Sequence, residues 1–248
     1  MIKHIPNALT LLNLLSGCIA VVLAVNENFV VAALFVFVGI FLDFFDGFAA
    51  RKLKVQSDLG LQLDSLADMV TSGVVPGIVM FKLFSLTQVG WLDNYHNDFQ
   101  TSLYELTGGG YLPFFGLFIT LASAYRLAKF NIDEDQQTYF KGLPTPANTL
   151  LIISLPLILE FQNNDAINGI ILNQWFLITL TILSCYLLNS NIKLFALKFK
   201  DFSFKNNATR YIFIMLCLVL LIVLKFAAIP IIILVYISMS VLDNLTSK

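Results

Sequence analysis

The sequence predicts an all-α membrane protein, built as a polytopic bundle of transmembrane helices. Its 248 residues are 58% hydrophobic, with a mean hydropathy of +0.80, and only 12% are Asp, Glu, Lys or Arg. A soluble domain carries about a quarter charged residues. Apolar runs of about twenty residues, the length that crosses the hydrocarbon layer as a helix, recur along the chain. These runs are continuous rather than alternating, which favours helices over a transmembrane β-barrel.

Eight apolar segments are expected to span the membrane. They cover residues 8–26, 29–50, 59–82, 110–130, 144–161, 167–188, 209–226 and 228–244. Almost no chain separates the last two, so we expect a tight hairpin there, and six spans plus this hairpin describe the same chain. The polar interruptions are too short to fold independently, which predicts one integral-membrane domain over residues 1–248.

The positions of Lys and Arg predict that both termini lie in the cytoplasm. With eight spans, thirteen of the fifteen cations fall on one side, and only Lys82 and Lys225 fall on the other. Such an excess marks the cytoplasmic side of a membrane protein. Segment 84–108, which has no Lys or Arg, is expected on the opposite side. We expect a protein of the bacterial cytoplasmic membrane, with lipids around it and no nucleic-acid partner.

The first span has an alternative interpretation as a cleaved signal peptide. Topology alone does not decide between the two, because removal of this span leaves the others as drawn. Asn7, Thr10 and Asn13 interrupt the apolar core that a signal peptide needs, which favours a retained helix.

The most informative stretch is DFFDGFAARKLKVQSDLGLQLDSLAD, residues 43–68, which holds five aspartates in a very apolar chain. Two sets of residues in it recur at helical spacing: Asp43, Asp46, Gly47 and Ala50 at the end of the second span, and Gly60, Asp64 and Asp68 at the start of the third. Residues three or four apart share a helix face. We expect the connection 52–58 to fold the two helices together, so that their small residues let the two faces meet.

Four carboxylates that converge in this way repel one another unless cations neutralise them. Asp43, Asp46, Asp64 and Asp68 are therefore candidate metal ligands. Oxygen ligands without His or Cys favour Mg²⁺, Mn²⁺ or Ca²⁺, and two such ions that share carboxylates suit phosphoryl transfer. A divalent-cation transporter is the alternative, since intramembrane carboxylates also line cation pathways. The acids lie at the cytoplasmic mouth rather than at mid-membrane depth, which favours catalysis.

The spacing Asp43-x2-Asp46-Gly47-x2-Ala50-Arg51-x8-Gly60-x3-Asp64-x3-Asp68 resembles the signature of the CDP-alcohol phosphotransferase family, with every fixed position present. The resemblance implies a six-helix catalytic core at about residues 5–188, with additional helices at about 209–244. It implies two bound Mg²⁺ or Mn²⁺ ions, with Asp68 also acting as general base. It also implies direct attack of an alcohol on a CDP-linked donor, with no covalent enzyme intermediate, and a homodimer as a candidate assembly.

The same resemblance implies a nucleotide pocket at the cytoplasmic mouth. The implied CDP-binding residues are Gly47, Ala50, Arg51 and Gly60 of the signature, with Asn7 and Thr10 of an N-terminal Pro-Asn-x2-Thr element. Polar side chains at the start of the first span would flank this mouth in any case.

Two further stretches, SAYRLAKFN at 123–131 and KGLPTPAN at 141–148, resemble membrane-integral phosphatidylserine synthases within this family. They imply CDP-diacylglycerol as donor and L-serine as acceptor. Arg126 suits the serine carboxylate, and Asn131, Lys141 and Thr145 are candidate neighbours. Inositol, inositol phosphate or glycerol phosphate are alternative acceptors, and for the two that carry a phosphate several cations here could surround it. In a purely structural interpretation, Arg126 and Lys129 are topology anchors and the Pro-Thr-Pro stretch is an ordinary helix start.

Overall fold

The computed structural model describes residues 4–88, 110–132, 139–195 and 204–246, and these are almost entirely helical. In chain order the elements are α1 (Ile5–Val25), α2 (Phe29–Leu53), α3 (Asp58–Asp68), the π-helix η2 (Met69–Val74), α4 (Val75–Gln88), the 3-10 helix η4 (Leu112–Leu117), α6 (Phe118–Ile132), β1 (Tyr139–Lys141), α7 (Thr145–Phe161), α8 (Asp165–Ile171), α9 (Gln174–Asn189), β2 (Lys193–Phe195), α10 (Phe204–Leu224), the 3-10 turn η5 (Lys225–Ala227) and α11 (Ala228–Thr246). The helical class predicted from composition is confirmed. The short antiparallel pair β1–β2 was not expected.

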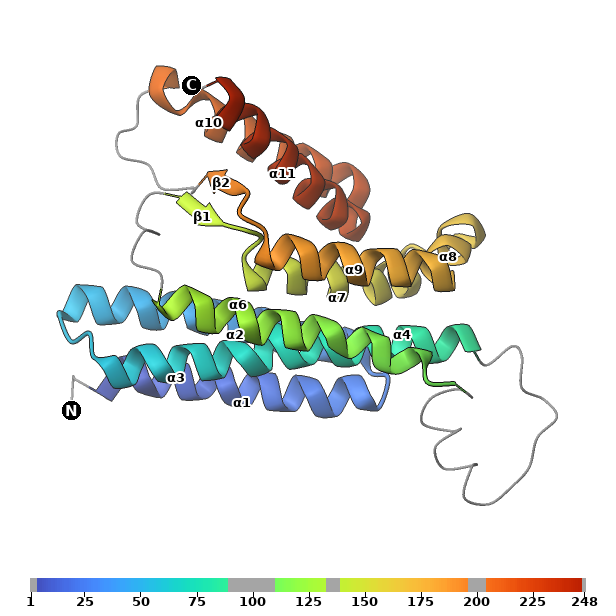
Figure 1. Cartoon of the computed structure of the whole chain (residues 1–248), viewed down its shortest axis with the longest axis horizontal. Helices are drawn as coiled ribbons and strands as arrows, with labels where there is room; N and C mark the ends of the chain where they lie inside the picture. The colour runs from blue at the N-terminus through green and yellow to red at the C-terminus, as the bar shows by residue number, and fades with distance from the viewer. Residues whose placement is uncertain (1–3, 89–109, 133–138, 196–203, 247–248) are drawn as a thin grey trace.

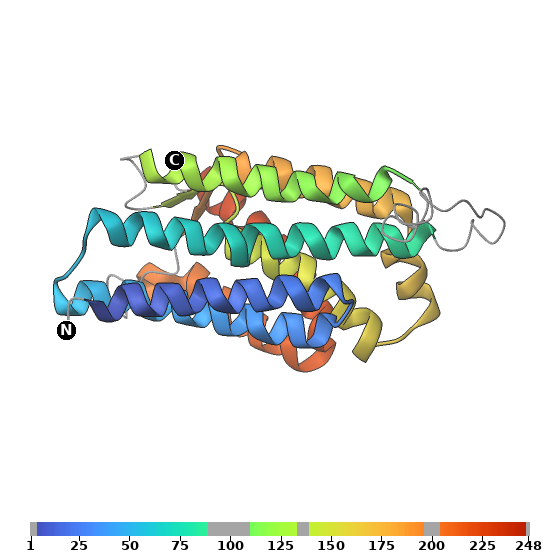
Figure 2. The ribbon, with the colours of Figure 1, turned by 90° about the horizontal axis from the view of Figure 1, so that it is seen from below.

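The helices form a bundle whose functional end can be followed in Figures 1 and 2. Helix α1 begins, α2 ends, α3 begins and α6 ends at one end of this bundle. The hairpin α10–α11 lies on the far side from α1, beyond α7 and α9, and α11 also ends at that same end (Figure 1). Most of segment 84–108, expected to face away from the cytoplasm, lies outside the described residues.

The described helices include enough long apolar stretches for an integral membrane protein. Four stretches can cross a membrane by length and composition: Ile5–Val25, Phe29–Leu53, Asp58–Thr87 and Arg210–Asn244, the last of which contains the α10–α11 hairpin. Helices α8 and α9 add a fifth if the bent pair is one span, and α7 is apolar but shorter. The structure thus supports four to five candidate spans, and the count of eight stays a prediction.

The expected span at 167–188 contains a break that the hydropathy did not predict. The chain breaks between α8 and α9, whose axes differ by 57°. Asn173 caps α9, because its Oδ1 accepts hydrogen bonds from the backbone N–H groups of Trp175 (2.9 Å) and Phe176 (3.3 Å). A side chain that offers such bonds competes with helix continuation and starts a new helix instead.

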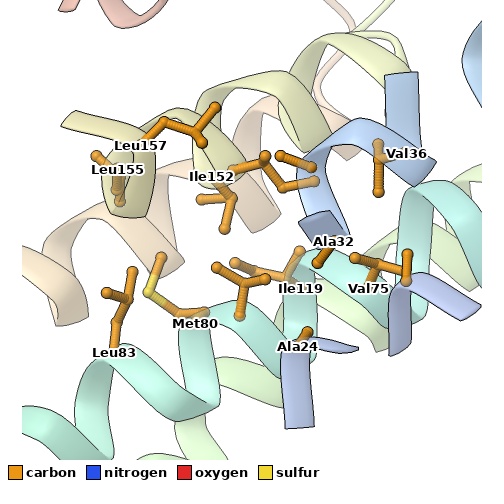
Figure 3. Close-up of a cluster of buried hydrophobic side chains, with 14 of the residues drawn as sticks. Ala24, Ala32, Val36, Val75, Met80, Leu83, Ile119, Ile152, Leu155 and Leu157 are labelled. Atoms are coloured by element: carbon orange, nitrogen blue, oxygen red, sulfur yellow. The ribbon is translucent and has the colours of Figure 1, made fainter. Parts of the chain in front are cut away.

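The main buried apolar core of the described residues draws on seven helices, and Ile171 of α8 and Leu177 of α9 belong to it as well as α1, α2, α4, α6 and α7. Figure 3 shows side chains from α1 (Ala24), α2 (Ala32, Val36), α4 (Val75, Met80, Leu83), α6 (Ile119) and α7 (Ile152, Leu155, Leu157) packed together. At the α1–α2 turn, Glu27 forms a 3.1 Å ion pair with Lys82 of α4. This core fixes α2 within the bundle, and the aspartates of α2 lie near its C-terminal end, away from the core residues Ala32 and Val36.

The faces of α2 and α3 meet at their aspartates, as expected, but the close approach of the two helix backbones through Gly47, Ala50 and Gly60 is wrong. Helix α3 packs mainly against α1, which packs along α2 as well. Gly60 illustrates this arrangement, since a Cβ at Gly60 would lie 3.3 Å from Oδ1 of Asn7 in α1. The facing ends of α2 and α3 therefore leave an open space between them, and α1 closes one side of it.

Candidate active site

A short connection brings the end of α2 and the start of α3 to one place. Helix α2 ends where Lys54 adopts a left-handed conformation with a φ of 54°. Ser57 caps α3, because its Oγ accepts a 3.1 Å hydrogen bond from the backbone N–H of Gly60. Each helix then carries its aspartates, at helical spacing, toward the same end of the bundle.

Asp43, Asp46 and Asp64 form a compact carboxylate cluster. One oxygen of each lies within 4.8 Å of those of the other two. Asp46 is buried, and Asp43 and Asp64 are half-buried. A donor set made only of carboxylate oxygens is the set that hard divalent ions prefer. The three residues therefore fit a hard divalent ion such as Mg²⁺, Mn²⁺ or Ca²⁺, as the spacing predicts.

Asp46 is held in place from α1. The Thr10 hydroxyl donates a hydrogen bond of 2.5 Å to Oδ2 of Asp46, and both side chains are buried. A short hydrogen bond to an ionised acceptor is one of the stronger kinds in proteins. Thr10 thus orients a carboxylate of the cluster, in addition to its place in the expected nucleotide pocket.

A cavity of about 360 Å³ opens beside the cluster, between the ends of α1, α2 and α3. All six residues expected to bind CDP line it: Asn7, Thr10, Gly47, Ala50, Arg51 and Gly60. Asp46 and Asp64 line it too, so one cavity presents both carboxylates and the Arg51 guanidinium. A volume of this size is typical of a small-molecule site.

Asp68 lies one helical turn beyond Asp64 and outside the compact group. It interacts electrostatically with Asp64 and Asp46 of the cluster, and with Arg126 of α6 on another side. Arg126 is buried, only 8% exposed, and its Nε has no hydrogen-bond partner among the described residues. Asp68 is therefore the carboxylate that links the cluster to Arg126.

The four residues expected to bind the acceptor are only partly brought together. Arg126 and Lys141 line one small cavity with Lys129 and Asn189. Asn131 lies elsewhere on α6 and exchanges hydrogen bonds of 2.8–3.0 Å with Ser65 of α3. Thr145 is buried at the start of α7 and does not line this cavity.

Two buried polar residues near Asp68 were not singled out from the sequence as functional. Asn13 of α1 and Thr71 of η2 are joined by a hydrogen bond of 2.8 Å. Asn13 was noted only as an interruption of an apolar run. A polar side chain repeated one turn after Thr10, on the same face of α1, was the signal that could have marked it.

Comparison with known proteins assigns this arrangement to a family. Residues 3–187 match the model of the CDP-alcohol phosphatidyltransferase family. The chain is 34% identical over 172 residues to the CDP-diacylglycerol–serine O-phosphatidyltransferase of Bacillus subtilis strain 168, an alignment that covers 68% of this chain and 81% of that protein. Proteins of the same name from Mycobacterium bovis and Methanocaldococcus jannaschii are each 29% identical to it.

Those two alignments cover 71% and 67% of this chain, and 55% and 66% of the mycobacterial and archaeal proteins respectively. The chain thus matches little more than half of the mycobacterial protein but most of the Bacillus one. A family match over most of the chain agrees with the signature and with the site that it forms. This chain belongs to the CDP-alcohol phosphatidyltransferase family of membrane enzymes.

Proposed function

We propose that the protein is a CDP-diacylglycerol–serine O-phosphatidyltransferase, which forms phosphatidylserine and CMP. The observation that carries the proposal is the single cavity in which the expected CDP-binding residues meet the carboxylates Asp46 and Asp64. The names of the relatives support serine as the acceptor. The family itself supports a role in phospholipid synthesis.

The donor would bind with its nucleotide in the cavity and its acyl chains toward the bilayer. Arg51 lines the cavity and can pair with the diphosphate, while Asn7 and Thr10 offer hydrogen bonds from α1. Gly60 leaves room at the side of the cavity, because a Cβ there would lie only 3.3 Å from Asn7 Oδ1 and from Ser57 Oγ. Exposed aromatic residues of α2, including Phe44 and Phe48, lie at the same end for contact with lipid.

Asp43, Asp46, Asp64 and Asp68 would hold two Mg²⁺ or Mn²⁺ ions, of which the first three residues form the compact part. Ions bound there would offset the negative charge of the diphosphate and of the leaving CMP. The chain itself contributes the fixed carboxylates, which are buried or half-buried in the bundle end and so pre-oriented before the donor arrives.

Asp68 would accept the proton of the serine hydroxyl. The hydroxyl oxygen then forms a bond with the β-phosphorus of CDP-diacylglycerol, the bond from that phosphorus to the CMP oxygen breaks, and CMP leaves with the electron pair. Arg126 interacts with Asp68 and has a buried Nε without a partner among the described residues. Its guanidinium is suited to the serine carboxylate and would hold the hydroxyl beside Asp68.

A second candidate acceptor is an alcohol that carries a phosphate, such as inositol phosphate or glycerol phosphate. Three cationic residues, Arg126, Lys129 and Lys141, line one small cavity next to this region. Several cations around one point suit a phosphate better than a single carboxylate. The names of the relatives support serine as the acceptor, whereas the positive charge of this small cavity supports a phosphate-bearing acceptor.

The domain bounds, the membrane orientation and the assembly of the protein are part of the same proposal. We propose that the catalytic core spans about residues 5–188, with the C-terminal hairpin added to it, and the match over 3–187 supports this. The excess of Lys and Arg supports a cytoplasmic site and cytoplasmic termini in a bacterial membrane. The homodimer implied by the family stays a prediction.

An Asp68→Asn variant tests the assigned chemistry. Purified protein would receive CDP-diacylglycerol, Mn²⁺ and labelled serine, with labelled phosphatidylserine as the readout and CDP-diacylglycerol binding measured in parallel. The expected result is loss of turnover with donor binding largely kept, since asparagine fills the same volume without the base. Asp165→Asn, at the exposed start of α8, is the matched control. Wild-type turnover in Asp68→Asn would refute the role of Asp68.

A further inference from the structure

Asn13 is a fully buried amide in the middle of α1, with an exposed fraction of 0%. Its Oδ1 accepts a hydrogen bond of 2.8 Å from the Thr71 hydroxyl. Its Nδ2 has no hydrogen-bond partner among the residues that the structure describes. A buried donor without a partner costs about 1–3 kcal/mol, so its presence calls for a functional or structural explanation.

The surroundings of Thr71 fix the position of this amide. Thr71 is 1% exposed and lies in η2, the π-helix that begins directly after Asp68. A Cβ at Gly17 would meet the Thr71 hydroxyl, and one at Gly39 would lie 2.8 Å from both Asn13 Oδ1 and Thr71 Cγ2. Two glycines, from α1 and α2, thus leave just enough room for the Asn13–Thr71 pair. Short π-helical segments inside α-helices frequently occur at functional sites.

The Asn13 amide is held close to Asp68. Thr71, which binds it, follows Asp68 by only three residues in the chain, and the Asn13 side chain lies within interaction range of the Asp68 carboxylate, to which Nδ2 makes no hydrogen bond in this structure. The Thr71 hydroxyl has two acceptors on Asn13, Oδ1 at 2.8 Å and the backbone carbonyl oxygen at 3.2 Å, and its one proton goes to the nearer, so Oδ1 faces Thr71 and Nδ2 is left for the carboxylate. The reverse orientation would place an oxygen against a carboxylate and is disfavoured.

We propose that Asn13 is a positioning residue for Asp68. Its amide, oriented by Thr71, donates to one oxygen of the Asp68 carboxylate and leaves the other oxygen directed at the acceptor hydroxyl. The inference rests on the proposed function, because it assigns to Asn13 a role in the proton transfer there. Thr71 acts one step further away, by fixing which end of the amide faces Asp68.

A kinetic comparison of four variants tests this proposal. Asn13→Leu has similar volume and removes the amide, and Thr71→Val removes the hydroxyl that orients it. Thr71→Ser keeps that hydroxyl. Ser16→Ala is the matched control. Ser16 is buried one turn after Asn13 on α1, and its hydroxyl donates a 2.7 Å hydrogen bond to the Phe35 carbonyl of α2 rather than to the Thr71 region.

Asn13→Leu and Thr71→Val are expected to lower kcat by roughly 10- to 100-fold, the usual effect of losing a group that orients a site residue. The KM for CDP-diacylglycerol should change by less than about 3-fold, since the donor pocket is untouched. Thr71→Ser should restore kcat to nearly the wild-type value, and Ser16→Ala should change thermal stability only. If Asn13→Leu fails to fold, the Thr71→Val and Thr71→Ser pair decides.

A purely structural role gives a different result. Asn13→Leu and Thr71→Val would then lower the melting temperature, as Ser16→Ala does, with kcat within about 2-fold of wild type, and this would overturn the proposal. If wild-type protein binds Mn²⁺ but transfers no phosphatidyl group, the proposed function fails by itself. Mn²⁺ affinity, measured by electron paramagnetic resonance, then decides: a fall of about 10-fold in Asn13→Leu supports the positioning of Asp68, and an unchanged affinity overturns it.

Discussion

Neutralising one member of the carboxylate cluster should stabilise the metal-free protein and remove its response to metal. The cluster of Asp43, Asp46 and Asp64 places three oxygens within 4.8 Å of one another. In Asp64→Asn the side chain keeps its shape and loses its charge. The electrostatic repulsion between residue 64 and the carboxylates of Asp43 and Asp46 therefore disappears, together with much of the attraction for a divalent ion.

The size of the effect follows from the separation. Two unit charges 4.8 Å apart interact by about 3.5 kcal/mol at the effective dielectric constant of about 20 that suits partly buried groups. Asp64→Asn removes two of the three pairs, which corresponds to about 7 kcal/mol for fully ionised carboxylates at that separation, a figure that counter-ions and bound protons reduce. In the other direction, an ion present at about a hundred times its Kd stabilises the wild type by about 2.7 kcal/mol.

Thermal unfolding of the purified protein in EDTA and in Mn²⁺ measures both effects. We expect Asp64→Asn to melt at or above the wild-type temperature in EDTA, and to gain little when Mn²⁺ is added. Asp165→Asn, which changes an exposed acid on α8, should behave as wild type in both conditions. A lower melting temperature for Asp64→Asn in EDTA, together with a wild-type gain in Mn²⁺, would refute the assignment of the cluster as a metal site.

Three other predictions concern α1, the acceptor side and helix packing. Thr10→Val should lower Mn²⁺ affinity by about 10-fold or more, because the 2.5 Å hydrogen bond to the cluster is lost, whereas Thr10→Ser should keep it; equal affinities would contradict this. Arg126→Lys should raise the KM for serine by about 10-fold in a steady-state assay and leave that for CDP-diacylglycerol unchanged, since lysine lacks the planar fork; no change in the serine KM would contradict a carboxylate contact. Gly17→Ala should destabilise the protein by about 1–3 kcal/mol in thermal unfolding, because the new methyl group overlaps Thr71. Gly169→Ala, where nothing lies within 4 Å, should gain up to about 1 kcal/mol; equal effects of the two alanines would contradict the packing.

The carboxylate cluster could be predicted from the sequence because its geometry is mostly local. Residues three or four apart share a face of a helix, so Asp43 with Asp46, and Asp64 with Asp68, had to lie together once the helices formed. A short connection then brings the two pairs to the same end of the bundle. The approach of the pairs to each other depends on a third helix, however, and local spacing contains no information about which helix lies opposite.

That limit accounts for the wrong expectation about α2 and α3, and for the missed residues. The sequence pattern assigned the close approach to Gly47 and Gly60, whereas the tightest glycine contacts near the site are those of Gly17 and Gly39 around Thr71. A lone Asn13 in an apolar helix becomes informative only when its partner on η2 is known. The break at Asn173 had a local signal, the capping asparagine, but the apolar residues on both sides of it dominated the hydropathy.

The most direct measurement of the central claim is CMP release by the purified protein with CDP-diacylglycerol and Mn²⁺. Serine, inositol, inositol phosphate and glycerol phosphate are offered separately, and the lipid product is identified by mass spectrometry. The account predicts release with serine, phosphatidylserine as the product, and no release from Asp68→Asn. Release with a phosphate-bearing alcohol alone would contradict serine as acceptor and favour the cation-lined cavity at Arg126 as a phosphate site. No release with any acceptor, from folded protein that binds Mn²⁺, would contradict the proposed transferase activity itself.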